Sequence, residues 1–290
     1  MRALVVDQPA PGRLRFAEVP TPVPNPDEVL IRVSAVSINY GELAFGLAYA
    51  PDGAIPGYDA AGVVVEAARD GRGPSVGTPV LSVGTMGGWA EYRAVPVDSV
   101  GIVPAGADLA VMSAVGTAGA TALRAVRKLG SVLGRRVLVT GASGGVGRFA
   151  VQLARQAGAS VLVSAAEVEE PVAGVIDLVG GGLLATSFAK LASGGVLVSV
   201  GHAAGAVADF DYVAMFADPA AVGRYDRSIV TLYLPAETGL AADLTWLAAE
   251  VAAGRLEPGV VWRGDWSRLT EAAELLLKRE LHGKAVLSVG

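Results

Sequence analysis

The chain contains no cysteine, so disulfides, thiolate nucleophiles and cysteine-ligated zinc are all excluded. Only two histidines are present, His202 and His282, which leaves little material for a histidine-ligated metal centre. No run of lysine and arginine stands out, and the net charge of −5 gives no electrostatic support for a nucleic-acid or anionic-membrane partner. We therefore expect a small-molecule substrate, with no metal, no nucleic acid and no membrane.

Long hydrophobic runs are also missing. The N-terminal apolar stretch stops at Asp7, too early for the core of a signal peptide, and no run reaches membrane-spanning length. A soluble cytoplasmic protein is the expectation. Apolar residues, in contrast, make up 52% of the 290 residues, and glycine occurs 38 times. This length and composition are sufficient for two domains with hydrophobic cores.

Residues 136–158 have the pattern of a strand, a glycine-rich turn and a helix. An apolar β-type run precedes the turn at 141–147, and apolar residues then recur at helical spacing until Gly158. Such a turn lets the backbone approach a phosphate, and the helix N-terminus offers N–H groups and the positive end of a dipole. The alternative is a turn whose glycines serve packing alone. The strand-and-helix context favours phosphate binding.

Two patterns divide the chain. Residues 1–110 contain short β-type runs separated by glycine and proline, typical of a small all-β module. Residues 111–257 alternate between helical patterns and strongly apolar strands, which indicates a parallel sheet covered on both faces. Residues 258–290 return to a mixed pattern and are expected to rejoin the first module. The expected domains are therefore 1–110 with 258–290, and 111–257.

The second domain is predicted to be incomplete. Only residues 165–173 separate the expected strands 159–164 and 174–179, whereas a crossover between parallel strands usually needs a dozen residues or more and a helix. The usual third strand and its flanking helices are therefore expected to be missing. In a dinucleotide-binding fold, this side of the sheet encloses the adenine and its ribose.

Motifs along nearly the whole chain resemble the medium-chain dehydrogenase/reductase superfamily, especially its zinc-independent quinone oxidoreductase and enoyl reductase branches. These motifs are Ile55–Val64, Val76–Leu81, Gly87–Tyr92, Gly116–Thr121, the turn at 141–147, Ile176–Gly181, Gly194–Val198 and Gly283–Val286. The resemblance implies an α/β fold, with a GroES-like β-barrel domain joined to a Rossmann doubly wound parallel sheet that is truncated here. It also implies NAD(P)H-dependent reduction of a conjugated carbonyl compound, an enoyl thioester or a quinone. Relatives pair through a strand near 228–234, which implies a homodimer.

The resemblance also assigns site residues. Tyr49 and Tyr40 are the candidate catalytic residues, since some enoyl reductases use a tyrosine near the first of these positions as a proton donor. The candidate cofactor-binding residues are Asn39, Thr121, Gly141, Ser143, Gly144, Gly145, Val146, Ser164, Glu167, Gly201 and His202. For Tyr49 the alternative is a packed loop aromatic, and for His202 a solvated loop residue.

The sequence departs from the NADPH-using relatives after the second strand. Residues 164–170 contain no cation to hold a 2′-phosphate, while Glu167 lies twenty residues after Gly147, at the spacing of an acid that binds a ribose 2′-OH. This favours NADH over NADPH, or no cofactor at all. Two functions therefore stay open: a nicotinamide-dependent reductase, and a cofactor-independent cyclase, isomerase or lyase acting on a biosynthetic intermediate. A non-catalytic binding protein is a third class that no feature selects.

Overall fold

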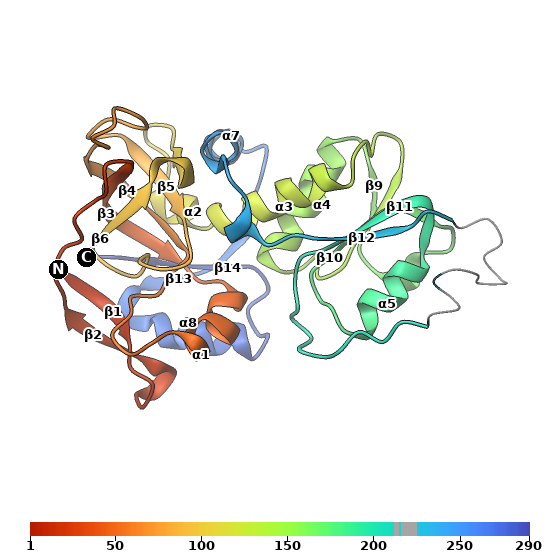
Figure 1. Cartoon of the computed structure of the whole chain (residues 1–290), viewed down its shortest axis with the longest axis horizontal. Helices are drawn as coiled ribbons and strands as arrows, with labels where there is room; N and C mark the ends of the chain where they lie inside the picture. Colours follow the sequence, from red (N-terminus) through yellow and green to blue (C-terminus); the bar gives the residue numbers. More distant parts are fainter. Residues whose placement is uncertain (212–214, 216–224) are drawn as a thin grey trace. The chain divides into compact units, whose positions relative to one another are not determined.

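The computed structural model describes residues 1–211, 215 and 225–290, and it divides into two compact units (Figure 1). The first unit consists of Met1–Ala120 and Pro235–Gly290, and the second of Thr121–Leu234. Helix α3 (Gly116–Lys128) therefore contains one of the boundaries. Both boundaries differ from those expected from the sequence, which were 110/111 and 257/258.

The difference arises because helix α7 (Leu240–Ala252) packs on strand β7 (Val100–Ile102). The N–H of Ile102 donates a hydrogen bond to Thr245 Oγ1 at 3.0 Å, and a Cβ at Gly101 would come within 2.5 Å of Leu244. The helical pattern of residues 240–252 resembles that of the second domain, but its apolar face is buried on the sheet of the first unit.

The first unit is built on a seven-stranded sheet of order β13-β14-β3-β4-β5-β7, with β6 paired to β3. Its strands are β3 (Glu28–Ser37), β4 (Asp59–Glu66), β5 (Pro79–Val83), β6 (Tyr92–Pro96), β7, β13 (Val260–Asp265) and β14 (Lys284–Ser288), and β1 (Arg2–Val6) pairs separately with β2 (Leu14–Glu18). Because β14 pairs with β3, the C-terminal tail rejoins the first module as expected.

Short helical segments connect these strands. They are η1 (Pro11–Arg13), η2 (Glu42–Gly46), α1 (Leu47–Tyr49), η3 (Val97–Ser99), α2 (Leu109–Ser113), η6 (Leu234–Ala236), η7 (Trp266–Arg268) and α8 (Leu269–Leu277). Segment η2 is a π-helix, a rare conformation that is frequent at functional sites.

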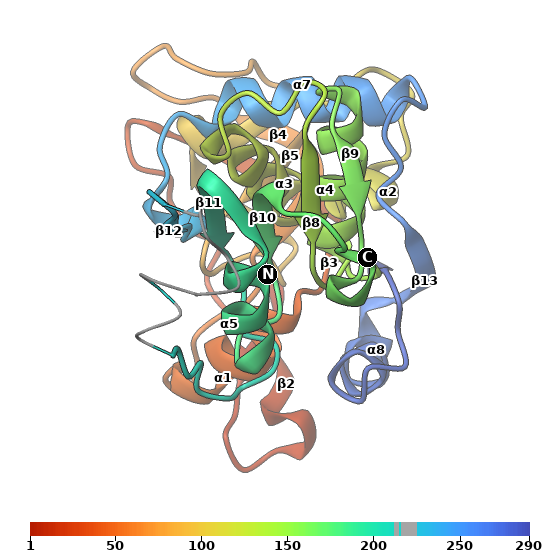
Figure 2. The same ribbon diagram turned by 90° about the vertical axis from the view of Figure 1, so that its right-hand side faces the viewer.

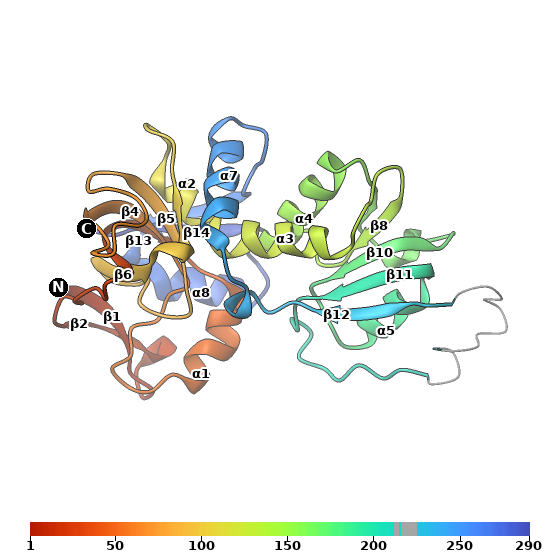
Figure 3. The same ribbon diagram turned by 45° about the horizontal axis from the view of Figure 1, so that its top comes forward.

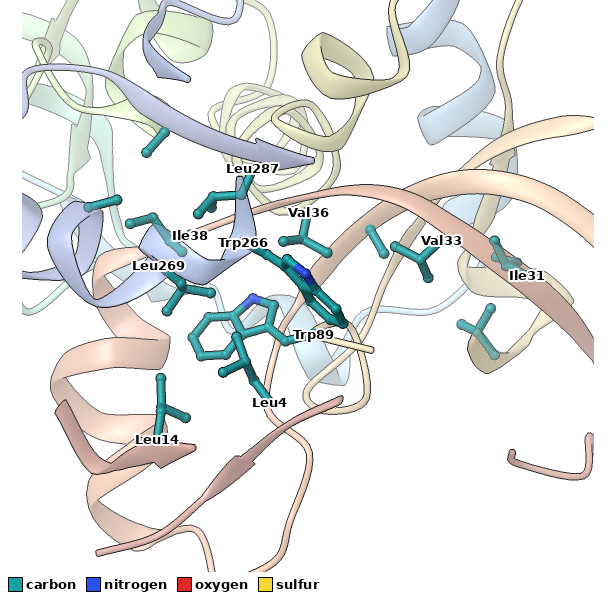
Figure 4. Packing of buried hydrophobic residues seen from close by; sticks show 14 of the residues in the cluster. Leu4, Leu14, Ile31, Val33, Val36, Ile38, Trp89, Trp266, Leu269 and Leu287 are labelled. Atoms are coloured by element: carbon teal, nitrogen blue, oxygen red, sulfur yellow. The ribbon is translucent and has the colours of Figure 1, made fainter. Parts of the chain in front are cut away.

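The core of the first unit gathers around two tryptophans, Trp89 and Trp266, with aliphatic side chains from β3, β14 and α8 (Figure 4). Trp89 is fully buried and Trp266 is 2% exposed. Gly57, at φ +106°, makes room for Trp89, because a Cβ there would lie 2.5 Å from the indole Cδ1. The glycine is therefore required both for its backbone conformation and for this close approach.

The second unit is a parallel five-stranded sheet of order β12-β11-β10-β8-β9, in which β10, β11 and β12 run side by side (Figure 3). The strands are β8 (Arg136–Val139), β9 (Ser160–Leu162), β10 (Val172–Asp177), β11 (Leu191–Ser199) and β12 (Ser228–Thr231). Helices α4 (Gly145–Gln156) and α5 (Gly182–Ala189) lie on opposite faces of the sheet (Figures 1 and 3). This is the doubly wound arrangement expected from the alternating pattern.

The sheet of the second unit ends at β9 (Figure 2). Within the described part of the chain, β9 pairs with β8 alone, and the connection to β10 contains one short 3-10 segment, η4 (Ala165–Glu167). The structure thus shows the narrow side that the short spacing between these strands predicts.

Across residues 1–211, 215 and 225–290, no helix combines the length and the apolar content needed to cross a bilayer.

Candidate functional site

The glycine-rich turn between β8 and α4 is shaped by three of its glycines. Gly141 adopts a φ of +65°, which favours glycine. A Cβ at Gly147 would lie 2.2 Å from the carbonyl oxygen of Gly141, so the start of α4 packs directly on the turn. Gly144 differs, since a Cβ there would meet only the Gly141 oxygen, at 3.5 Å. Its missing side chain therefore leaves open space beside the helix N-terminus.

Helix α4 begins without a side-chain cap. Its N-cap residue is Gly144, in an extended conformation, and its first turn contains no acidic residue. Helix α2, in contrast, begins at Asp108, whose carboxylate accepts from the N–H groups of Ala110 and Val111. The first N–H groups of a helix have no partner within the helix. At α4 no side chain caps these N–H groups, and the helix N-terminus beside the space left by Gly144 is suited to binding an anion such as a phosphate.

A cavity of about 300 Å³ lies at the same edge of this sheet. It is lined by residues that follow β10, including Gly180 and Gly181, and by residues that follow β11, including Gly201 and His202. Because β8, β10 and β11 are parallel neighbours, the glycine turn and the cavity both lie at their carboxyl ends. The chain proceeds from β8 to β9 on one side and to β10 on the other, so this is the switch point at which open α/β sheets bind ligands.

Hydrogen bonds of Asp177 and Thr140 connect the ends of β10 and β8 at the switch point. The carboxylate of Asp177, fully buried at the end of β10, accepts from Thr140 Oγ1 at 2.6 Å and from the Gly180 N–H at 2.8 Å. Thr140 Oγ1 in turn accepts from the Leu178 N–H at 3.1 Å. These bonds hold the ends of the two central strands together below the cavity.

The polar residues that follow β9 make separate contacts and do not form a network. The hydroxyl of Ser164 accepts from the Ala166 N–H at 3.2 Å and so caps η4. Glu167 is exposed at the end of η4. Glu170 pairs with Arg136 at the opposite end of β8. Of the three acidic residues that follow β9, Glu167 is thus the one that stays nearest the carboxyl end of the strand.

Four elements of the first unit converge on the carboxylate of Asp59, at the start of β4. It accepts from Ser37 Oγ at 3.0 Å, from Asn39 Nδ2 at 2.8 Å, and from both the N–H and the hydroxyl of Thr117, at 2.7 and 2.6 Å. The ammonium of Lys284 lies 3.5 Å away and donates to Asn39 Oδ1 at 2.7 Å. The Asn39 amide, predicted to bind cofactor, is thereby held inside this network.

Glu42, the first residue of η2, extends the network into the helical segment that contains both candidate tyrosines. Its two oxygens accept from the N–H of Asn39 at 2.5 Å and of Tyr58 at 2.8 Å, and it is 1% exposed. Burial raises the pKa of this carboxyl to about 8, and the negative charge of Asp59 adds to the rise. The raised pKa favours the protonated form of Glu42 at neutral pH.

The candidate tyrosines lie in different surroundings. Tyr40 is half-buried and makes an edge-to-face contact with Phe45, with ring centroids 6.4 Å apart. Tyr49, at the end of α1, is 88% exposed. Among the candidate cofactor residues, Thr121 is 6% exposed, while His202 is exposed at the cavity.

Two family models match the chain: an alcohol dehydrogenase GroES-like domain over residues 25–105, and a zinc-binding dehydrogenase domain over residues 154–287. The acrylyl-CoA reductase of Ruegeria pomeroyi is 31% identical over 258 residues, covering 70% of this chain and 75% of its own. The chain belongs to the medium-chain dehydrogenase/reductase superfamily.

Solved structures of this superfamily align along the full chain. The quinone oxidoreductase from Coxiella burnetii is 26% identical, with a TM-score of 0.81, and covers 100% of this chain and 99% of its own. A mycobacterial protein solved in complex with NADPH is also 26% identical, with a TM-score of 0.79 and full coverage of both chains. Other curated relatives, from Sulfurisphaera tokodaii, tomato and pig, are matched over 58%, 37% and 48% of their own length.

The superfamily includes metal-dependent members, and one similar structure contains cobalt and zinc. In this chain, over the residues that the structure describes, no three His, Cys, Asp or Glu side chains gather in a group that could hold a metal ion.

Sequence reasoning missed the network around Asp59, Glu42 and Lys284. A signal was present, since Asp59 precedes a buried apolar run and Lys284 precedes another. Charged residues are almost never fully buried unless they are paired, so two of opposite sign at the ends of buried strands suggest a pair. Their adjacency depends on β14 returning to β3 from the end of the chain.

Proposed function

We propose that this superfamily member is an NAD(P)H-dependent reductase of a conjugated carbonyl compound, an enoyl thioester or a quinone. The uncapped N-terminus of α4, beside the open space at Gly144, is the observation that carries the proposal. The substrate class is supported by the names of relatives, which include acrylyl-CoA reductase and quinone oxidoreductase. A bound reduced nicotinamide would supply a hydride to one carbon of the double bond of an enone or enoyl thioester, and a proton would reach the other carbon. A quinone would take up a hydride and a proton to give the hydroquinone.

Different residues of the second unit bind different parts of the cofactor in this proposal. The N–H groups of Gly145 and Val146 bind the diphosphate, with Gly144 leaving the room that it needs. Gly201 and His202 are proposed to contact the nicotinamide end, which is supported by their position in the lining of the cavity. In the first unit, Tyr40 or Tyr49 supplies the proton, and the network around Asp59 holds the helical segment that contains both tyrosines.

NADH is the proposed form of the cofactor. Between Arg155 and Lys190 the chain has no lysine or arginine, and Ser164 is engaged as the cap of η4. Glu167, exposed after β9, is suited to accept from a ribose 2′-OH and would repel a 2′-phosphate.

Replacing Gly144 with valine is expected to weaken NADH binding at least about tenfold while lowering the free energy of unfolding by no more than about 1 kcal/mol, the cost of a poorer N-cap residue. The φ of −77° suits any residue, and a Cβ would make only an ordinary contact with Gly141. Valine therefore fits the protein but occupies the space of the diphosphate. Isothermal titration of wild type and variant with NADH and NADPH measures the effect. Wild type that binds neither nucleotide at millimolar concentration would exclude the reductase function.

A cofactor-independent cyclase, isomerase or lyase is the second candidate. It is favoured by the end of the sheet at β9, which removes elements that would enclose the adenosine. In that case the Gly144→Val variant would keep full activity on the true substrate. In the reductase it would lose activity together with nucleotide binding.

We also propose a homodimer that forms through β12, which pairs only with β11 in the described part of the chain. Ile229 is 38% exposed on β12, and Tyr225 and Tyr233, which precede and follow the strand, are 61% and 68% exposed. An open apolar edge strand is a template for pairing. Sedimentation equilibrium is expected to give twice the chain mass of 29.3 kDa for wild type and a single chain mass for Ile229→Lys. A wild-type monomer would contradict the dimer.

A further inference from the structure

The first turn of helix α4 contains a cation where an acid would be favourable. Its sequence is Gly145-Val-Gly-Arg148, and no acidic residue accompanies the arginine. The N-terminus of a helix is the positive end of its dipole, so a cation there destabilises the helix unless an anion is present. The other arginine of this helix, Arg155, lies in the last turn, where a cation is favourable.

The side chain of Arg148 is folded back over the glycine turn. Its Nε donates to the carbonyl oxygen of Ser143 at 3.2 Å, and Ser143 directly precedes the N-cap residue. This direction follows from helix geometry, because side chains tilt toward the N-terminus. The guanidinium is thereby anchored next to the open space at Gly144, on the same turn as the N–H groups of Gly145 and Val146.

The segment from β9 to α5 offers a dinucleotide no positive charge. No lysine or arginine occurs between Arg155 and Lys190, and the residues after β9 include the exposed Glu167. The sheet also ends at β9, so contacts to the adenosine from a further strand are missing in the described chain. A bound dinucleotide carries two negative charges on its diphosphate, directly over the turn that Arg148 spans.

We propose that Arg148 binds the diphosphate of the dinucleotide and supplies affinity that the shortened adenosine side does not. This inference rests on the proposed function, since it concerns the same nucleotide. An arginine can donate in a fork to phosphate oxygens, which makes it better suited than lysine. The ligands recognised are nucleotides that contain a diphosphate, so ADP and NADH both depend on Arg148, while adenosine does not.

Isothermal titration with NADH, ADP and adenosine tests the proposal in wild type, Arg148→Met, Arg148→Lys and the matched control Arg155→Met. Arg155 is exposed at the other end of the same helix, so its loss changes the net charge equally. We expect Arg148→Met to raise the Kd of NADH and of ADP about tenfold or more, with Arg148→Lys intermediate. Arg155→Met should change neither Kd by more than about twofold. The melting temperature of Arg148→Met should change little, because the loss of the exposed hydrogen bond to Ser143 is offset by removal of a cation that opposes the helix dipole.

The outcomes separate the two proposals. Wild type that binds NADH, with an unchanged Kd in Arg148→Met, would overturn the role of Arg148 and leave the reductase function standing. Equal weakening in Arg148→Met and Arg155→Met would also overturn it, since the effect would then come from net charge. Wild type that binds neither NADH nor ADP would overturn both.

Discussion

Replacing Glu42 with glutamine is expected to change how the free energy of unfolding depends on pH. The free energy of unfolding of the variant minus that of wild type should rise by about 4 kcal/mol between pH 5 and pH 8. The carboxyl is buried, and its pKa is raised from 4.5 to about 8, first by burial and then by the charge of Asp59. Lys284 and the N–H groups of Tyr58 and Asn39 oppose the rise but do not cancel it.

The sign follows from the proton that the folded state retains. Between pH 4.5 and about 8, the folded protein keeps the proton on Glu42, whereas the unfolded chain has released it. Folding then takes up a proton, so the free energy of unfolding falls by about 1.4 kcal/mol for each pH unit in this window. The stabilising contribution of the Glu42 proton is fully present below the pKa of this group in the unfolded chain, 4.5. It is lost as the pH rises through the pKa of the group in the folded protein, about 8. Glutamine carries no such proton and removes this slope.

Denaturant unfolding of wild type and Glu42→Gln at several pH values measures the difference. At pH 5 the variant is expected to be less stable by about 1 to 3 kcal/mol, because its amide group can accept from only one of the two backbone donors. Glu66→Gln, at an exposed position on β4, is the control and should run parallel to wild type. If the free energy of unfolding of Glu42→Gln changes with pH as that of wild type does, the Glu42 carboxyl is ionised in the folded protein and the prediction is wrong.

The arrangement of the second unit could be predicted from its sequence because local signals agree with the fold. The apolar strands, the glycine turn and the helix from Gly145 all appear in the structure. The short connection between β9 and β10 predicted a sheet that ends at β9, since chain length alone excludes a helical crossover. These inferences needed only neighbouring residues.

Other features depend on contacts between distant parts of the chain. Helix α7 has the pattern of the second unit, and only its packing on β7 assigns it to the first. The π-helix at Glu42–Gly46 has no sequence signature. The role of Asn39 shows the same limit: its position was marked by resemblance, but its amide is oriented by Asp59 and Lys284, which lie 20 and 245 residues away in sequence.

Replacing Lys284 with methionine is expected to lower the free energy of unfolding by about 3 to 5 kcal/mol. Methionine preserves much of the side-chain volume but removes the only cation within 4 Å of Asp59 in the described chain. Asp59 is fully buried, and an unpaired buried charge is strongly destabilising. The same change leaves the Ile38 carbonyl and the Asn39 amide without their donor.

The double variant Asp59→Asn/Lys284→Met separates the charge pair from the packing around it. Because both charges are then absent, its loss should be smaller than the sum of the single losses, with a coupling of about 1 to 3 kcal/mol. Lys278→Met is the matched control, since Lys278 pairs with Glu274 at 3.4 Å with both side chains more than 60% exposed. Its loss should stay below about 0.5 kcal/mol. A Lys284→Met loss no larger than that of Lys278→Met would mean that water or a rearranged neighbour compensates Asp59. The pairing of Lys284 with Asp59 would then not be what holds the helical segment from Tyr40 to Tyr49 in place.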